Sequence, residues 1–144
     1  MPTVADVLAV KGEQVHSVSP QTTVLDTIRK MNQHKIGAVL VMHDRQVAGI
    51  FTERDVLRRV IGEEKNPAQV TVAEVMTEDV ICVGPDTDLD EVSTIMKQRK
   101  VRHVPVCEDG KVHGMISIGD VNAVHASSQD AQIHFLSEYI YGRV

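Results

Sequence analysis

The sequence predicts an α+β fold, of α/β type, in which one strand–helix–strand–strand–helix unit occurs twice. Residues 15–56 align with residues 80–121 without a gap, and 14 of the 42 positions are identical. Inside each copy, helical and strand-like apolar patterns alternate. Each copy also ends on a similar stretch, GIFTERD at 49–55 and GMISIGD at 114–120. Because a repeat defines the architecture of the whole chain, we expect two similar units that pack against each other.

The elements of each copy follow from its apolar spacing. Each opens on a strand and continues into a helix. The first helix reaches His34, and its counterpart carries Leu89, Val92, Ile95 and Met96. Two strands joined by a turn come next, at 37–42 and 47–51 in the first copy and at 103–108 and 112–117 in the second. Helical spacing resumes after Thr52 and after Ser117.

These elements divide the chain into four segments. The first repeat with its N-terminal segment covers 1–62, a charged linker covers 63–70, the second repeat covers 71–126, and a C-terminal amphipathic helix covers 127–144. A shorter echo, TVADVL at 3–8 and TVAEVM at 71–76, extends the duplication upstream. In the C-terminal segment, Ile133, Leu136 and Ile140 form a helical stripe. This stripe either docks onto its own module or serves a dimer or partner interface.

Composition excludes several classes of protein. The 15 basic and 20 acidic residues give a net charge of −5, whereas a nucleic-acid-binding protein normally presents a basic face. No stretch approaches the roughly 18 apolar residues of a membrane span. The first six residues lack the basic start and apolar stretch of a signal peptide. We therefore expect a cytoplasmic protein without a membrane span, or an organellar one after removal of a targeting segment.

The duplicated endings carry the candidate chemistry. Thr52 with Asp55, and Ser117 with Asp120, have the spacing of a capping box, in which a hydroxyl and an acid satisfy backbone N–H groups at a helix start. A carboxylate fixed in this way can also accept hydrogen bonds from the two hydroxyls of a ribose, as in dinucleotide-binding folds. The cap and the ribose interpretation are compatible, because the cap holds the carboxylate in place.

The residues resemble a tandem pair of CBS domains, the Bateman module. The resemblance spans about residues 3–126 and is carried by AEVMT at 73–77, KIGAVLV at 35–41, KVRHVPV at 100–106 and the two endings. The chain is similar to stand-alone bacterial and organellar CBS-pair proteins. The implied fold is two β-α-β-β-α CBS repeats packed pseudo-symmetrically into one Bateman module, here with an extra C-terminal helix.

The resemblance also implies two adenosine sites between the repeats. Each combines a capped helix start from one repeat, for the ribose, with a strand start from the other, for the base. One site comprises Ser117 and Asp120 with Thr22, Ile36, Gly37 and Ala38. The other comprises Thr52, Arg54 and Asp55 with Thr87, Val101, Arg102 and His103. No catalytic residue and no metal site is implied.

The two sites differ in charge. Arg54, Arg102 and His103 could neutralise phosphates at the first helix start through charge-assisted hydrogen bonds, although Arg54, Arg58 and Arg59 also fit a solvated helix face. Gly119 occupies the position of Arg54 in the second ending. We therefore expect the second ending to lack a nearby cation of its own.

The sequence contains no nucleophile elbow, HExxH or P-loop, so we expect no enzyme. Cys82 and Cys107 lie far apart without a metal-binding pattern, and small buried thiols are expected. The hypothesis is a homodimeric regulatory module that senses AMP, ADP, ATP, NAD(H) or S-adenosylmethionine and relays occupancy to an unidentified protein. The alternatives are a ligand-independent dimerisation or adaptor module and a redox-linked regulator that uses Cys82 or Cys107.

Overall fold

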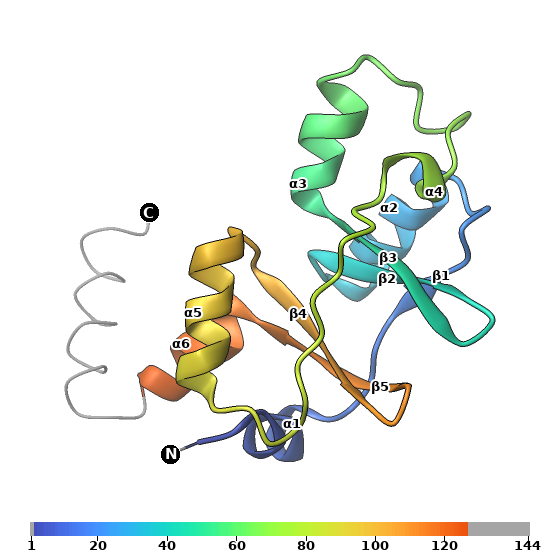
Figure 1. The fold of residues 1–144 in the computed structure, drawn as a ribbon. Coiled ribbons are helices and arrows are strands. Elements are labelled where there is room, and N and C mark those ends of the chain that lie inside the picture. The colour runs from blue at the N-terminus through green and yellow to red at the C-terminus, as the bar shows by residue number, and fades with distance from the viewer. Residues whose placement is uncertain (1, 127–144) are drawn as a thin grey trace, which may run out of the picture. The chain divides into compact units, whose positions relative to one another are not determined.

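The computed structural model describes residues 2–126, so the predicted C-terminal helix at 127–144 lies outside the described residues. The chain forms two compact units (Figure 1). Within the described residues, the α1 unit comprises 2–13, 82–108 and 112–126, and the α4 unit comprises Gln14–Ile81 and Asp109–Lys111. The mixed helix and strand content confirms the predicted α+β class.

The α4 unit contains a three-stranded sheet in the order β1-β2-β3. Strand β1 runs parallel to β2, and β2 runs antiparallel to β3 with a bulge between Val41 and Met42. The elements in chain order are β1 (Ser17–Val18), α2 (Val24–His34), β2 (Ala38–His43), β3 (Gln46–Thr52), α3 (Glu53–Asp55), the π-helix η1 (Val56–Ile61) and α4 (Val72–Val75). The predicted helix after Thr52 is thus a short α-helical turn that continues as a π-helix.

In the α1 unit, β4 pairs with β5. The elements are α1 (Val4–Lys11), α5 (Leu89–Arg99), β4 (His103–Glu108), β5 (Lys111–Ser117) and α6 (Ile118–His125). The first strand predicted for the second copy is reduced to one parallel bridge between Val83 and Val106. In the first copy, the Leu40 N–H donates to the His16 carbonyl. Pro105 occupies the equivalent position in the second copy and has no N–H to donate, so the longer pairing cannot form.

Both hairpin turns have two residues with positive φ. Asp44 and Arg45 have φ values of 49° and 66°, and Asp109 and Gly110 have values of 53° and 75°. Two successive residues of this kind form the tight turn that matches the twist of paired strands. Glycine adopts positive φ without the clash that a Cβ atom introduces, so Arg45 is the less favourable residue for its turn.

The upstream echo forms helices that the sequence analysis did not predict. Helix α1 lies upstream of the copy at 15–56 but packs with β4, β5 and α5 of the other copy. Helix α4 lies upstream of the copy at 80–121 but packs with the first copy. The two arrangements match bond for bond. Val4 N–H donates to the Thr87 carbonyl at 2.9 Å, and Val72 N–H donates to the Thr22 carbonyl at 2.8 Å.

The glycine at the start of each duplicated ending makes room for the upstream segment of its unit. A Cβ atom on Gly114 would lie 2.6 Å from Leu8 Cδ2. A Cβ atom on Gly49 would lie 2.5 Å from Met76 Sδ and 2.8 Å from the Thr77 carbonyl oxygen. Leu8 and Met76 are equivalent positions of the echo. A Cβ atom on Gly49 would therefore meet backbone as well as side chain, whereas a Cβ atom on Gly114 would meet only the flexible Leu8 side chain.

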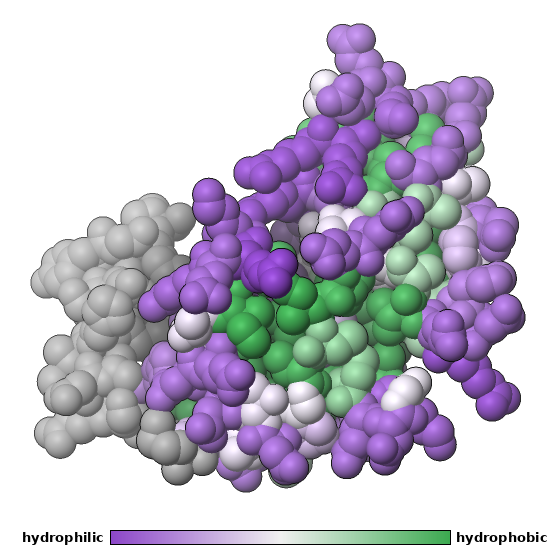
Figure 2. Space-filling view, in the orientation of Figure 1, coloured by the Kyte–Doolittle hydropathy of each residue, from purple (hydrophilic) through white to green (hydrophobic). Residues whose placement is uncertain are grey.

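Each unit has its own hydrophobic core. Met96 and Ile116 lie in the core of the α1 unit, and Met31 and Phe51 lie in that of the α4 unit. Met31 and Met96 occupy equivalent positions of the two repeats, and both are buried. Figure 2 shows hydrophobic residues gathered in the region of β4 and β5, with hydrophilic residues around them.

Three further observations concern the described residues alone. No helix within residues 2–126 is long and apolar enough to cross a membrane. No group of three or more His, Cys, Asp or Glu side chains in this range is arranged to hold a metal ion. Cys82 is exposed and Cys107 is half-buried, so the expectation of two buried thiols is wrong.

Candidate functional site

The two duplicated endings form matching capped helix starts. Thr52 accepts from the Asp55 N–H at 3.3 Å, while Asp55 Oδ2 accepts from the Thr52 N–H at 3.0 Å and from its hydroxyl at 3.3 Å. At the start of α6, the corresponding distances for Ser117 and Asp120 are 3.2, 2.8 and 3.0 Å. The predicted capping boxes are confirmed.

Asp55 is almost fully buried, with 7% of its surface exposed. Its second oxygen, Oδ1, accepts from the Thr77 hydroxyl at 3.3 Å and lies 3.7 Å from Arg59 Nε. Arg59 also donates to the Met76 carbonyl at 2.8 Å. Arg59 therefore joins the carboxylate to the segment that follows α4, in addition to lying on the exposed face that the sequence suggested.

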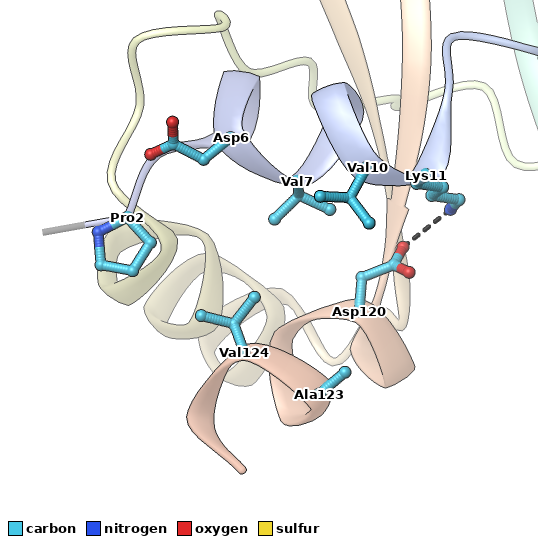
Figure 3. Close-up of a pocket in the computed structure, with 8 residues that line it drawn as sticks. All are labelled: Pro2, Asp6, Val7, Val10, Lys11, Asp120, Ala123 and Val124. Atoms are coloured by element: carbon cyan, nitrogen blue, oxygen red, sulfur yellow. Dashed lines mark hydrogen bonds and ion pairs between the residues drawn. The ribbon is translucent and has the colours of Figure 1, made fainter. Parts of the chain in front are cut away.

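Asp120 has a different partner, which the sequence analysis missed. Lys11 Nζ, at the end of α1, lies 2.7 Å from Asp120 Oδ2 (Figure 3). It also lies 2.7 Å from the Met115 carbonyl oxygen. The second ending has no cation of its own, as expected, but Lys11 supplies one from a distant segment. The two residues are 109 positions apart, and the echo that aligns α1 with α4 stops at Leu8, so no local pattern connects them.

The environment of Asp120 favours its charged form. Burial by itself raises the pKa of Asp120, but the Lys11 ammonium and the Ser117 N–H and hydroxyl together outweigh burial and hold the pKa below its usual value. Among residues 2–126, the hydrogen bonds to this carboxylate all end on Oδ2. Its Oδ1 therefore keeps lone pairs that can accept hydrogen bonds from a ligand.

A pocket of about 320 Å³ lies between α1 and α6, beside this ion pair. Figure 3 shows Val7, Val10 and Val124 along the pocket, with the Lys11–Asp120 pair at one end. Val10 is 92% exposed. The pocket thus places an apolar surface next to a charged pair within the α1 unit.

The strand starts that were predicted to contact the base lie beside the helix start of their own unit. The Gly37 carbonyl accepts from the Glu53 N–H at 3.1 Å, and the Arg102 carbonyl accepts from the Ile118 N–H at 2.8 Å. Ala38 is buried at the start of β2. Ile36 and Val101 each pack against the core of their own unit.

The remaining predicted residues are distributed between the two units. Thr22 and Thr87 hold α4 and α1 through their carbonyls, and the Thr22 hydroxyl lies 3.0 Å from that of Ser19. Arg54 lies in α3, Arg102 is exposed just before β4, and His103 is the first residue of β4. Each predicted site combines a helix start of one unit with a strand start of the other, so the structure describes its two halves separately.

The sequence of the chain is similar to that of a CBS domain-containing protein. It is 33% identical to the mitochondrial CBS domain-containing protein CBSX3 of Arabidopsis thaliana, in an alignment that covers 97% of this chain and 72% of the relative.

Solved structures share the fold. The CBS-domain protein ATU1752 of Agrobacterium tumefaciens is 39% identical, with a TM-score of 0.82 over 85% of this chain and 98% of that one. The CBS domain pair of protein MJ0100, solved with 5′-methylthioadenosine and S-adenosyl-L-methionine, is 21% identical. Its TM-score is 0.78, and the match covers 88% of this chain and 98% of that one.

A family model described as the CBS domain matches this chain twice, at residues 4–62 and 72–125. CBS domains in general are regulatory modules and not catalytic ones. The two matches cover most of the chain, and they coincide with the two copies of the repeat. The chain therefore belongs to the CBS-domain family, as a pair of CBS domains.

Proposed function

We propose that this chain is a non-catalytic regulatory module that binds an adenosine-containing ligand and relays its occupancy to another protein. The observation that carries the proposal is the pair of carboxylates, Asp55 and Asp120, fixed in equivalent capping boxes. A carboxylate that is already ordered loses little conformational entropy when it binds the two hydroxyls of a ribose. Asp120 is also held in the charged form that accepts such bonds.

The proposed sites use both repeats. In one, Thr52, Arg54 and Asp55 bind the ribose and phosphate side of the ligand, and the base contacts come from Thr87, Val101, Arg102 and His103. In the other, Ser117 and Asp120 bind the ribose, and the base contacts come from Thr22, Ile36, Gly37 and Ala38. Lys11 supports the second site by fixing and charging Asp120.

The charges around the sites favour a ligand that carries phosphate. Arg54, Arg102 and His103 belong to the first site, and Lys11 lies at the second. Cations of this kind bind phosphate oxygens through charge-assisted hydrogen bonds. Among AMP, ADP, ATP, NAD(H) and S-adenosylmethionine, we favour AMP or NAD. The MJ0100 complex shows that the same fold accommodates adenosine ligands in that protein. A homodimer located in the cytoplasm completes the proposal.

Titration calorimetry with these five ligands tests the proposal on the wild type and on two variants, Asp55→Asn and Asp120→Asn. Asparagine keeps the volume of the side chain and removes its charge. Each variant is expected to lose about tenfold or more in affinity at one site, since a charge-assisted hydrogen bond contributes roughly 1.5–3 kcal/mol. Glu74→Gln is the matched control, because Glu74 completes the capping box of α4 at 2.8 Å from the Thr71 N–H, where no ligand is proposed.

A second candidate, a ligand-independent dimerisation or adaptor module, is favoured by one observation. Capping boxes also occur at α1, with Thr3 and Asp6, and at α4, so capping alone accounts for the duplicated pattern. This candidate predicts that no adenine nucleotide binds the wild type. It also predicts that light scattering gives the same dimer for the wild type, Asp55→Asn and Asp120→Asn. That combination of results would exclude the nucleotide sensor.

A further inference from the structure

Two cysteines lie side by side in the α1 unit. The Sγ atoms of Cys82 and Cys107 are 2.9 Å apart, although the residues are 25 positions apart in the chain. A disulfide requires roughly 2.05 Å between the sulfurs. The two sulfurs would therefore have to approach each other by about 0.9 Å, a movement within the range of side-chain rotation.

The backbone holds these cysteines together. Val83 forms a parallel bridge with Val106, so Cys82 precedes one side of the bridge and Cys107 follows the other. The Val83 N–H donates to the Pro105 carbonyl at 3.0 Å, and the Cys107 N–H donates to the Val83 carbonyl at 2.9 Å. The proximity of the thiols thus depends on the pairing of two chain segments and not on the position of a loose loop.

We infer that Cys82 and Cys107 form a redox-reactive dithiol, which a hydroperoxide oxidises to an intramolecular disulfide. This site is independent of the proposed nucleotide sites, because it uses neither of the two capping boxes. A small hydroperoxide can reach the exposed thiol and accept two electrons from the pair.

The environments of the two thiols assign them different roles. Cys82 is exposed to solvent, whereas Cys107 is half-buried. Burial, followed by the hydrogen bond and the charge interaction with Cys82, raises the pKa of Cys107 to about 12. Since the thiolate is the nucleophile, Cys82 is the residue that attacks the oxidant, and Cys107 reacts second.

The chemistry balances in two steps. The Cys82 thiolate attacks one oxygen of hydrogen peroxide, the O–O bond breaks, and the departing hydroxide takes up a proton to become water, which leaves a sulfenic acid on Cys82. The Cys107 sulfur then attacks the Cys82 sulfur. The S–O bond breaks, and the hydroxyl leaves as water with the Cys107 proton. Two thiols have lost two electrons, and one peroxide has become two waters.

The bond would have a defined structural consequence. The chain leaves the α4 unit at Ile81, and Cys82 is the first residue of the segment that follows in the α1 unit. Cys107 lies in β4. Oxidation would fasten the entering chain covalently to β4, next to the single bridge that Pro105 leaves there.

Peptide mapping tests the inference on the full chain. The protein is treated with hydrogen peroxide, blocked with iodoacetamide and digested with trypsin without reduction. The expected product is a link between peptides 66–97 and 103–111, each of which contains one cysteine. On a non-reducing gel, the oxidised protein should keep the mobility of a single chain. A link found only in chains of doubled mass, or two fully alkylated cysteines after peroxide treatment, would overturn the inference.

Two variants test the assigned roles. In Cys107→Ser, dimedone should trap a sulfenic acid on Cys82, because the second thiol is missing. In Cys82→Ser, Cys107 should remain alkylatable after the same treatment, since its thiol is the protected one. If Cys107 is oxidised in Cys82→Ser as fast as Cys82 is in Cys107→Ser, the assignment of Cys82 as the attacking thiol is wrong.

Discussion

Replacing Lys11 with Met tests whether its ion pair with Asp120 stabilises the fold. The substitution keeps the length and the apolar stem of the side chain and removes the ammonium. In the wild type, Lys11 Nζ lies 2.7 Å from Asp120 Oδ2, and the two side chains are 36% and 21% exposed. Exposed pairs contribute roughly 0.2–1 kcal/mol, and hydrogen bonds to buried charges roughly 1.5–3 kcal/mol. For a pair between these limits, we expect a loss of about 1 kcal/mol of unfolding free energy at pH 7.

The loss should depend on pH in a definite direction. The pKa of Asp120 is lowered in the folded protein, whereas an unfolded aspartate has a pKa of about 3.9. A group with a lowered folded pKa contributes stability above its unfolded pKa and loses that contribution as pH falls through the folded pKa. The difference between the wild type and Lys11→Met should therefore be largest near neutral pH and should shrink toward pH 3.

Urea denaturation at pH 7 and at pH 3 measures this difference. Lys11→Arg is the matched control, since it keeps a cation at the position that faces Asp120. Its effect on unfolding free energy should be similar at the two pH values. If Lys11→Met has the same effect at both pH values, or no effect at pH 7, then the attraction between Lys11 and Asp120 does not stabilise the α1 unit.

Two further predictions concern the backbone and are checked by thermal or urea unfolding. Gly49→Ala should lower the unfolding free energy by about 2–3 kcal/mol, and Gly114→Ala should lower it by about 1 kcal/mol. The new Cβ atom meets the Thr77 carbonyl in the first variant and only a flexible side chain in the second. Equal losses in the two variants would contradict this explanation. Arg45→Gly should raise the unfolding free energy by about 0.5 kcal/mol, and Gly110→Ala should lower it by about 1 kcal/mol, since both positions have positive φ. Changes of the same sign at these two positions would show that the turn conformation does not limit stability.

Much of the fold was predictable because it is encoded locally. The helical stripe around Met31 and Met96, the two hairpins and the capping boxes each depend on residues within about one helical turn or one strand of each other. Where one residue cannot form the hydrogen bond that its counterpart forms, the two copies differ in structure. Pro105 is the example, since its missing N–H reduces a predicted strand to a single bridge.

The parts that were missed depend on contacts between distant segments. Lys11 and Asp120 are 109 positions apart, and nothing in the spacing of either residue indicates the other. The same holds for Cys82 and Cys107, which are adjacent only because the chain beside Val83 pairs with β4. Local periodicity predicts which face of an element is buried, but it does not predict which segment packs on that face.

The duplication extends from the sequence to the tertiary contacts of the candidate carboxylates. In each unit, an upstream helix is held by a threonine carbonyl and packs against the glycine of the duplicated ending. In each unit, the same segment also provides a partner for the carboxylate: Thr77 for Asp55 and Lys11 for Asp120. A ligand that displaces one of these carboxylates would therefore change its contact with the upstream segment of that unit. The connections differ in chemistry: Asp55 is joined to its segment by the Thr77 hydroxyl and the Arg59 guanidinium, and Asp120 is joined to α1 by the Lys11 ammonium.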